Sequence, residues 1–193
     1  MADNLSDPLN GYNEKVVLAQ AREMAHGGYL AAGFRYINLD GYWNMPTRDA
    51  SGHLVADPSR FPSGIKALAD KVHALGLRLG IYTAMCGNAV PPIVDPKTGV
   101  VMQQDIDDFL RWGVDEVKVD AAGGCITPHL NESYIKLGKA LLAATNGSRP
   151  ILYSCSWPAY TDPHWPSQYR EMAGHCNMWR KYEHSNTPSR LCL

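Results

Sequence analysis

Residues 112–120 read WGVDEVKVD, and this stretch holds both the end of a helix and a complete buried strand. Gly113 follows a run of apolar residues at helical spacing, as a helix-terminating glycine does. The next residues are rich in valine, which is typical of a strand covered on both faces. The same junction occurs as AGF at residues 32–34 and as LGL at residues 75–77. The sequence therefore predicts a repeated helix–strand unit.

Working outward from this repeat, helical and strand patterns alternate along the chain. The expected helices are residues 13–32, 65–75, 103–112 and 134–144. The expected strands are residues 34–39, 77–83, 116–119 and 151–154, with a fifth at 177–182. Such alternation predicts a parallel sheet with helical crossovers.

Two architectures fit a parallel sheet of this kind, an open doubly wound sheet and a (β/α)8 barrel. The turn after the first strand lacks a GxGxxG motif, and the chain has no GxxxxGK[ST] phosphate loop. Polar and aromatic residues instead recur at the C-terminal ends of successive strands, where a barrel places its chemistry: Asp40, Tyr82, Asp120 and Ser156. A barrel needs roughly 200 residues or more, so the prediction is an α/β fold, an incomplete (β/α)8 TIM-type barrel with parallel strands.

The composition is that of a folded domain and excludes several functions. Apolar residues make up 45% of the 193 positions, and 18 basic residues face 19 acidic ones. This balance gives no electrostatic reason to bind nucleic acid or a membrane surface. Residues 1–9 lack the apolar run of a signal peptide. The five cysteines contain no CxxC spacing and the histidines are scattered, so we expect no metal and no cofactor.

Two carboxylates stand out as candidates for chemistry. Lys118 and Asp120 are two apart on a strand and point to the same face, which is the interior of a barrel. An ammonium group nearby favours the charged form of Asp120, as a nucleophile requires, although a structural ion pair gives the same pattern.

Asp40 precedes Tyr42 and Trp43, and a carboxylate with aromatic rings is typical of sugar binding. Three further aspartates, Asp105, Asp107 and Asp108, favour a helix N-terminus rather than a metal site.

Several ordered segments resemble glycoside hydrolase family 27, the melibiase group of α-galactosidases and α-N-acetylgalactosaminidases. The similarity extends over residues 12–182. The matching segments are YINLD at 36–40, DPSRFPSGI at 57–65, GLRLGIY at 76–82, WGVDEVKVD at 112–120, YSCSWPAY at 153–160 and CNMWR at 176–180.

The resemblance implies a retaining glycosidase acting on terminal α-galactosyl or α-N-acetylgalactosaminyl glycans. Asp120 matches the nucleophile of the family, and four residues match positions that bind sugar hydroxyls: Asp40, Tyr82, Lys118 and Arg180. The family also implies a Cys155–Cys176 disulfide and leaves Cys86 and Cys125 as a second pair. Small residues at Ser156 and Ala159, where galactose-specific members resemble Glu and Leu, favour a 2-acetamido sugar.

The chain also departs from the family pattern. Residues 1–11 form a tail without the expected first barrel strand, and Gly41 replaces a second aspartate. The acid/base aspartate is replaced by His184, with Glu183 one residue short. Residues 183–193 show neither strand nor helix pattern, so we expect a partial barrel over residues 12–182, truncated at both ends.

Three functions follow from these observations. The first is an α-galactosidase-class enzyme leaning to N-acetylgalactosamine. The second is a catalytically inactive truncated isoform or gene-model fragment of the same family, because a retaining glycosidase needs its proton donor. The third is a sugar-binding remnant. The family implies secretion or a lysosomal location and leaves open a homodimer for full-length relatives.

Overall fold

The computed structural model describes residues 11–86, 90–95, 98–121, 130–145, 149–157 and 170–180. Helices and strands alternate along the chain, as predicted. Their bounds are α1 Glu14–His26, β1 Tyr36–Asn38, α2 Gly64–His73, β2 Arg78–Ala84, α3 Gln103–Trp112, β3 Glu116–Asp120, α4 Leu130–Thr145, β4 Leu152–Cys155 and β5 Met178–Trp179. Each expected strand is present, although β5 is short and residues 181–182 of its predicted range lie outside the described residues.

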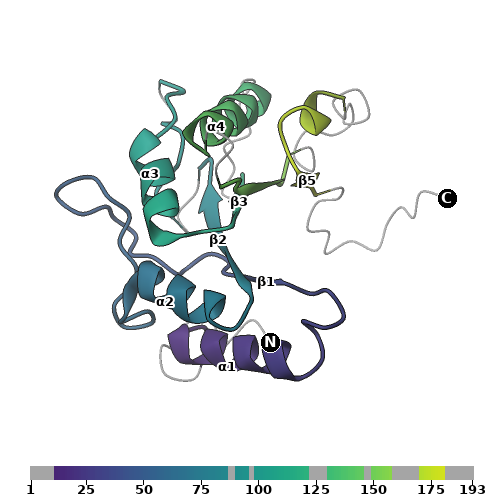
Figure 1. Ribbon diagram of the computed structural model, residues 1–193. Helices are drawn as coiled ribbons and strands as arrows, with labels where there is room; N and C mark the ends of the chain where they lie inside the picture. The colour runs from purple at the N-terminus through teal and green to yellow at the C-terminus, as the bar shows by residue number, and fades with distance from the viewer. Residues whose placement is uncertain are drawn as a thin grey trace, which may run out of the picture.

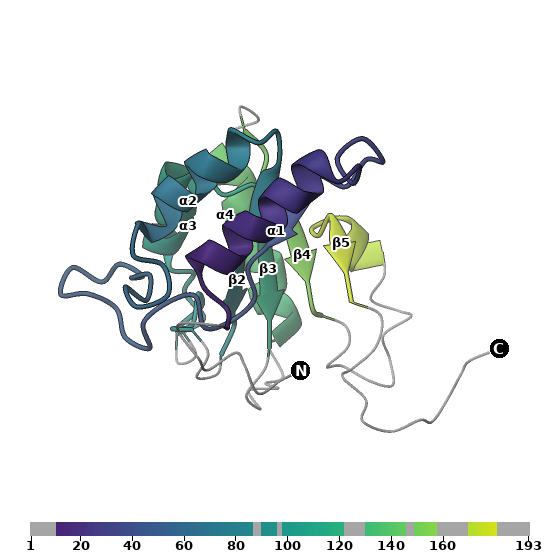
Figure 2. The same ribbon diagram turned by 90° about the horizontal axis from the view of Figure 1, so that it is seen from below.

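The strands form one parallel sheet in the order β1-β2-β3-β4-β5. Each strand therefore pairs with the next along the chain, which is the connectivity of a barrel rather than of a doubly wound sheet. Figures 1 and 2 show the helices gathered on one side of the sheet, which curls into half a barrel. The predicted incomplete barrel is confirmed.

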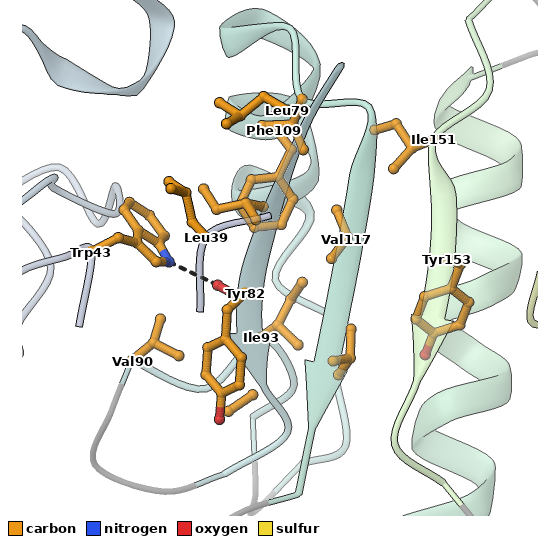
Figure 3. Close-up of a cluster of buried hydrophobic side chains, with 14 of the residues drawn as sticks. Leu39, Trp43, Leu79, Tyr82, Val90, Ile93, Phe109, Val117, Ile151 and Tyr153 are labelled. Carbon is orange, nitrogen blue, oxygen red and sulfur yellow. Dashed lines mark hydrogen bonds between the residues drawn. The ribbon is translucent and has the colours of Figure 1, made fainter. Parts of the chain in front are cut away.

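The hydrophobic core lies between the sheet and the helices. Every second residue of the strands points toward the helices, that is, to the outer face of the curled sheet. These residues are all buried: Ile37, Leu39, Leu79, Ile81, Val117, Val119 and Tyr153. Figure 3 shows Phe109 of α3 beside Leu79, with Val117 and Tyr153 on the neighbouring strands. Burying a side chain of this size stabilises the fold by about 1.5–3 kcal/mol. This packing holds the strand ends in fixed positions.

Helix α1 is shorter than the sequence pattern predicted. The expected helix extended to residue 32, whereas α1 ends at His26 and is followed by Gly27 and Gly28. Gly28 has a φ of +90°, which glycine adopts without a steric penalty and which stops helix propagation. Residues 29–33 then form turns, and Gly33 ends that connection rather than the helix. Two adjacent glycines outweigh the apolar spacing that continues beyond them.

Local contacts set the start of α1 and the end of α3, and they join α1 to α2. The Asn13 side chain accepts a hydrogen bond from the amide of Val16 and caps α1. The buried Glu14 carboxylate accepts bonds from Ser63 and Lys71 and so ties α1 to α2. Gly113 takes a left-handed conformation, with φ of +80°, directly after α3, as its position in the sequence predicted.

Within the described ranges, every helix is too short or too polar to cross a membrane.

Candidate active site on the inner face of the sheet

The inner face of the sheet carries the polar residues. The strand register places them in rows across the strands, since Tyr82 pairs with Lys118, which pairs with Ser154, and Ala84 pairs with Asp120. The backbone hydrogen bonds continue this register by one or two residues past the strand ends. By this continuation, the row at the carboxyl ends consists of Ala84, Asp120, Ser156 and Arg180. The row below it consists of Asp40, Tyr82, Lys118, Ser154 and Met178. The alternation of side chains thus brings the predicted site residues of five neighbouring strands onto one surface.

Asp120 ends the central strand, and two hydrogen bonds hold its backbone and its side chain. Its carbonyl oxygen accepts a hydrogen bond from the Met85 amide at 2.7 Å. Its carboxylate Oδ1 accepts one from the Ala121 amide at 2.9 Å. The residue is only 5% exposed. The Ala121 bond orients one carboxylate oxygen, and the strand alternation places the side chain on the inner face. A nucleophile that attacks a bound carbon atom needs such positioning.

Among the described residues, Lys118 forms its ion pair with Asp40 and not with Asp120, which the sequence pattern suggested. Its Nζ lies 2.7 Å from Asp40 Oδ2 and 5.1 Å from the centroid of the Tyr82 ring. Residues two apart on a strand are separated by about 6.6 Å along it. The long lysine side chain instead reaches sideways over β2, where the aromatic ring supports its charge.

Asp40 lies just beyond β1, at the outer edge of this charged group. Its side chain is 72% exposed, whereas that of Lys118 is 30% exposed. The Tyr12 hydroxyl donates to the Asp40 carbonyl at 3.1 Å, and the Gly41 amide donates to its carboxylate. Burial, together with the Asp40 charge, raises the pKa of the Tyr12 phenol, so that group stays protonated. Asp40 is therefore a positioned, solvent-facing acceptor for hydroxyl groups.

On the other side of Asp120, β4 and β5 bring Ser156 and Arg180 to the same row. The Ser156 amide donates to the Val119 carbonyl at 2.9 Å, and the Arg180 amide donates to the Cys155 carbonyl at 2.8 Å. Cys155 and Cys176 form the predicted disulfide, which links the two strands. The backbone pairing of β4 with β5 therefore places Ser156 next to Arg180 at the strand ends, and the disulfide fastens the two segments together.

Some predicted residues lie outside the described part of the chain. These are Ala159, Glu183, His184 and Cys125. Cys86 is disulfide-bonded, but the partner that the family resemblance gives it, Cys125, is one of these residues. The proton donor of a glycosidase and half of the acetamide pocket therefore stay predictions.

The two aromatic residues after Asp40 have different roles, which corrects the expectation that both face a sugar. Trp43 is fully buried, and its indole Nε1 donates to the Tyr82 carbonyl at 2.8 Å. Figure 3 shows this bond on the core side of β2. Trp43 is therefore a core residue that anchors β2. Tyr42, in contrast, is 57% exposed.

The sequence analysis missed a buried polar cluster beneath Lys118. Glu116 is 3% exposed and accepts a hydrogen bond from the Asn38 amide at 3.1 Å. The two side chains meet over Gly80. Only glycine fits at this position, because a β-carbon there would lie 2.1 Å from Asn38 Oδ1. Burial raises the pKa of the Glu116 carboxyl, against the opposing effects of Asn38 and Lys118. The period-two alternation with Lys118 and Asp120 could have placed Glu116 on this face.

The aspartates of α3 do more than favour its N-terminus. Asp105 is fully buried and accepts bonds through both oxygens from the Arg48 guanidinium. Asp108 pairs with His53 and Arg111. These contacts fasten the connection between β1 and α2 to α3. Within the described residues, no three metal-ligating side chains come together.

The chain is similar in sequence to α-galactosidases and α-N-acetylgalactosaminidases. The family model described as alpha galactosidase A matches residues 2–188. The chain is 43% identical to human alpha-N-acetylgalactosaminidase over 180 residues, covering 92% of this chain and 42% of that protein. It is 37% identical to human alpha-galactosidase A, covering 93% of this chain and 41% of that protein.

A solved structure with the same fold is alpha-galactosidase I from Mortierella vinacea. It superposes with a TM-score of 0.72 at 30% sequence identity, covering 97% of this chain and 47% of that chain. The present chain thus spans less than half the length of each of these relatives.

Proposed function

Since the chain belongs to the alpha galactosidase A family, we propose that its inner face acts on terminal α-linked galactose or N-acetylgalactosamine by a retaining mechanism. The observation that carries the proposal is the row of polar groups around Asp120. A buried, oriented carboxylate stands at the end of the central strand, and a lysine–aspartate pair with a tyrosine ring lies beside it.

In the proposed reaction, one Asp120 oxygen attacks the anomeric carbon of the sugar. A carbon–oxygen bond forms on one face while the bond to the leaving oxygen breaks on the other. Asp40, Lys118 and Tyr82 hold hydroxyl groups of the same sugar. Water then hydrolyses the glycosyl ester and regenerates the carboxylate.

The leaving oxygen of a natural glycan needs a proton, and the family position for this donor is His184, with Glu183 beside it. The phenolate of an aryl glycoside with an acidic phenol leaves without that proton. Such a substrate therefore tests the role of Asp120 separately from the proton donor. We expect 2,4-dinitrophenyl α-galactoside or the 2-acetamido analogue to attach its sugar to the peptide that contains Asp120. Mass spectrometry of a proteolytic digest measures this product.

Two variants make this test decisive. Asp120→Asn is expected to abolish labelling, whereas Asp70→Asn, which removes an exposed carboxylate on α2, is expected to leave it unchanged. Labelling that persists in the Asp120→Asn variant would contradict the assignment of the nucleophile. Labelling without turnover of natural glycosides would favour the inactive or sugar-binding alternatives. It would show that Asp120 attacks the sugar but that no group protonates the leaving oxygen of a natural glycan.

The substrate preference follows from the side of the site formed by β4. Ser156 is buried in the same row as Asp120, and a small side chain there leaves space for an acetamide. The combined change Ser156→Glu and Ala159→Leu is expected to shift binding from N-acetylgalactosamine toward galactose. An unchanged ratio of the two dissociation constants would contradict this preference.

The cellular location belongs to the same proposal. A disulfide between Cys155 and Cys176 is typical of an oxidising compartment. It supports a secreted or lysosomal protein, and it can be tested by locating the tagged chain in cells.

A further inference from the structure

We propose that the Tyr42 ring stacks on the apolar face of the terminal sugar whose hydroxyl groups bind Asp40. This inference rests on the proposed function and extends it to a residue that the family motifs do not include. Four observations on Tyr42 lead to it: its backbone conformation, its exposure, the contacts that hold its backbone and its place beside Asp40.

The backbone of Tyr42 is in an unusual conformation. Its φ is +66°, and it is the one non-glycine residue with a positive φ among those that the structure describes. A side chain with a β-carbon is disfavoured in this region, and glycine would adopt it freely. Such strain persists where the surrounding structure enforces it, and it concentrates at ligand-binding positions.

Contacts on both sides of Tyr42 enforce this conformation. The Gly41 amide donates to the Asp40 carboxylate at 2.7 Å. The next residue, Trp43, is buried and anchored through its indole to Tyr82, and its carbonyl accepts from the Asp57 amide at 2.9 Å. Tyr42 therefore lies between two fixed neighbours.

The Tyr42 carbonyl itself accepts a hydrogen bond from the Arg60 guanidinium at 3.4 Å. Arg60 pairs in turn with Asp57 through its Nε at 3.5 Å. The backbone that carries the ring is thus rigid, although the ring is exposed. With the backbone fixed, binding a ligand costs only the freedom of the two side-chain torsions of the tyrosine.

Position and chemistry identify the ligand as the sugar at Asp40. The two residues are separated by two peptide units, so their Cα atoms lie at most about 7 Å apart. A galactose-type ring carries an axial hydroxyl on one face, which leaves an apolar patch of C–H groups on the opposite face. A carboxylate for the hydroxyls and an aromatic ring for the C–H patch together match both parts of such a sugar.

The test measures the binding of methyl α-galactoside to the full chain by NMR titration. We expect Tyr42→Phe and Tyr42→Trp to bind within about twofold of the unaltered chain, and Tyr42→Ala and Tyr42→Gly to bind about fivefold to tenfold more weakly. The sugar H-3, H-4 and H-5 resonances are expected to show ring-current shifts that both small variants lose. Tyr29→Ala, which removes another exposed tyrosine before β1, is the matched control.

The glycine variant separates the ring from the backbone. Glycine accepts a positive φ, so Tyr42→Gly keeps the loop folded even where Tyr42→Ala does not. Affinity in Tyr42→Gly equal to that of the unaltered chain would overturn the stacking role. If the sugar binds and Asp40→Asn weakens it while all Tyr42 variants bind normally, the Tyr42 proposal alone is overturned. If the unaltered chain binds neither methyl α-galactoside nor its 2-acetamido analogue, the proposed function is overturned together with the Tyr42 proposal.

Discussion

Lys118 and Asp40 form an ion pair across the width of β2, with Nζ 2.7 Å from Oδ2. The two residues are 78 positions apart in the chain, and the Tyr82 ring lies beneath the ammonium group. The pair links the outer edge of the sheet to the strand that ends in Asp120. It places a positive charge on the same face as the Asp120 carboxylate, where it can bind the hydroxyl groups of a sugar.

The first prediction concerns the function of this pair. Asp40→Asn is expected to lower the affinity for methyl α-galactoside at least tenfold, because a charged acceptor for hydroxyl groups is lost. It is expected to change the free energy of unfolding by less than about 1 kcal/mol, because the Asp40 side chain is largely exposed. Titration and urea denaturation measure the two effects.

The matched control for this prediction is Asp70→Asn. Asp70 also pairs with a lysine, Lys66, at 2.7 Å, but on the exposed side of α2. It is expected to change stability as little as Asp40→Asn does and to leave sugar binding intact. Equal affinity in the two variants would show that Asp40 does not contact the sugar.

A second prediction concerns the clamp between Arg48 and α3. Arg48→Met leaves the buried Asp105 carboxylate without its cation and also removes the bonds to the carbonyls of Gly52 and Pro92. Breaking a buried pair of this kind costs about 3–5 kcal/mol of unfolding free energy. Arg22→Met, on the exposed side of α1, is expected to have almost no effect, and a similar loss in both variants would contradict a structural role for the clamp.

The third prediction is a pH dependence that arises at Glu116. Burial holds its folded-state pKa above the ordinary value of 4.5. As the pH rises above that value, the unfolded chain releases its proton first, and stability falls until the folded carboxyl also ionises. Glu116→Gln removes this loss, so its stability relative to the unaltered chain is expected to rise across the window.

Urea denaturation at acidic and neutral pH measures this difference. The amide oxygen that Glu116→Gln introduces can still accept the hydrogen bond from Asn38, so the change isolates the charge. The two proteins are expected to be equally stable where Glu116 is protonated in both states. A constant difference at every pH would mean that the effect comes from packing and not from ionisation.

The fourth prediction concerns the link between β4 and β5. The Cys155–Cys176 bond closes a loop with a sequence separation of 21 residues. In the chain-entropy description, a loop of this size stabilises the folded state by about 3 kcal/mol. The double variant Cys155→Ala and Cys176→Ala is expected to lose that amount in urea denaturation. Reduction of the unaltered chain is expected to cost more, because Cys86 is also disulfide-bonded.

Local patterns predicted most of the fold, and their failures have physical reasons. Helix α3 was predicted with its observed bounds, because Gly113 provides a clear stop. Helix α1 was predicted too long, because apolar spacing continued past two glycines that end it. Tyr42 and Trp43 are neighbours with the same aromatic character, so only their packing could show that one is buried and the other exposed.

The amino-acid sequence by itself indicated the alternation of helices and strands and the parallel sheet. It also placed Lys118 and Asp120 on one face, because the period of a strand alone decides which side chains share a face. It also indicated the family, through motifs that are contiguous in the chain. Only the tertiary structure decided that Lys118 binds Asp40, that Glu116 meets Asn38 over Gly80 and that Arg48 clamps α3. These contacts join residues from separate elements, and they depend on how closely the curled sheet and its helices bring side chains together.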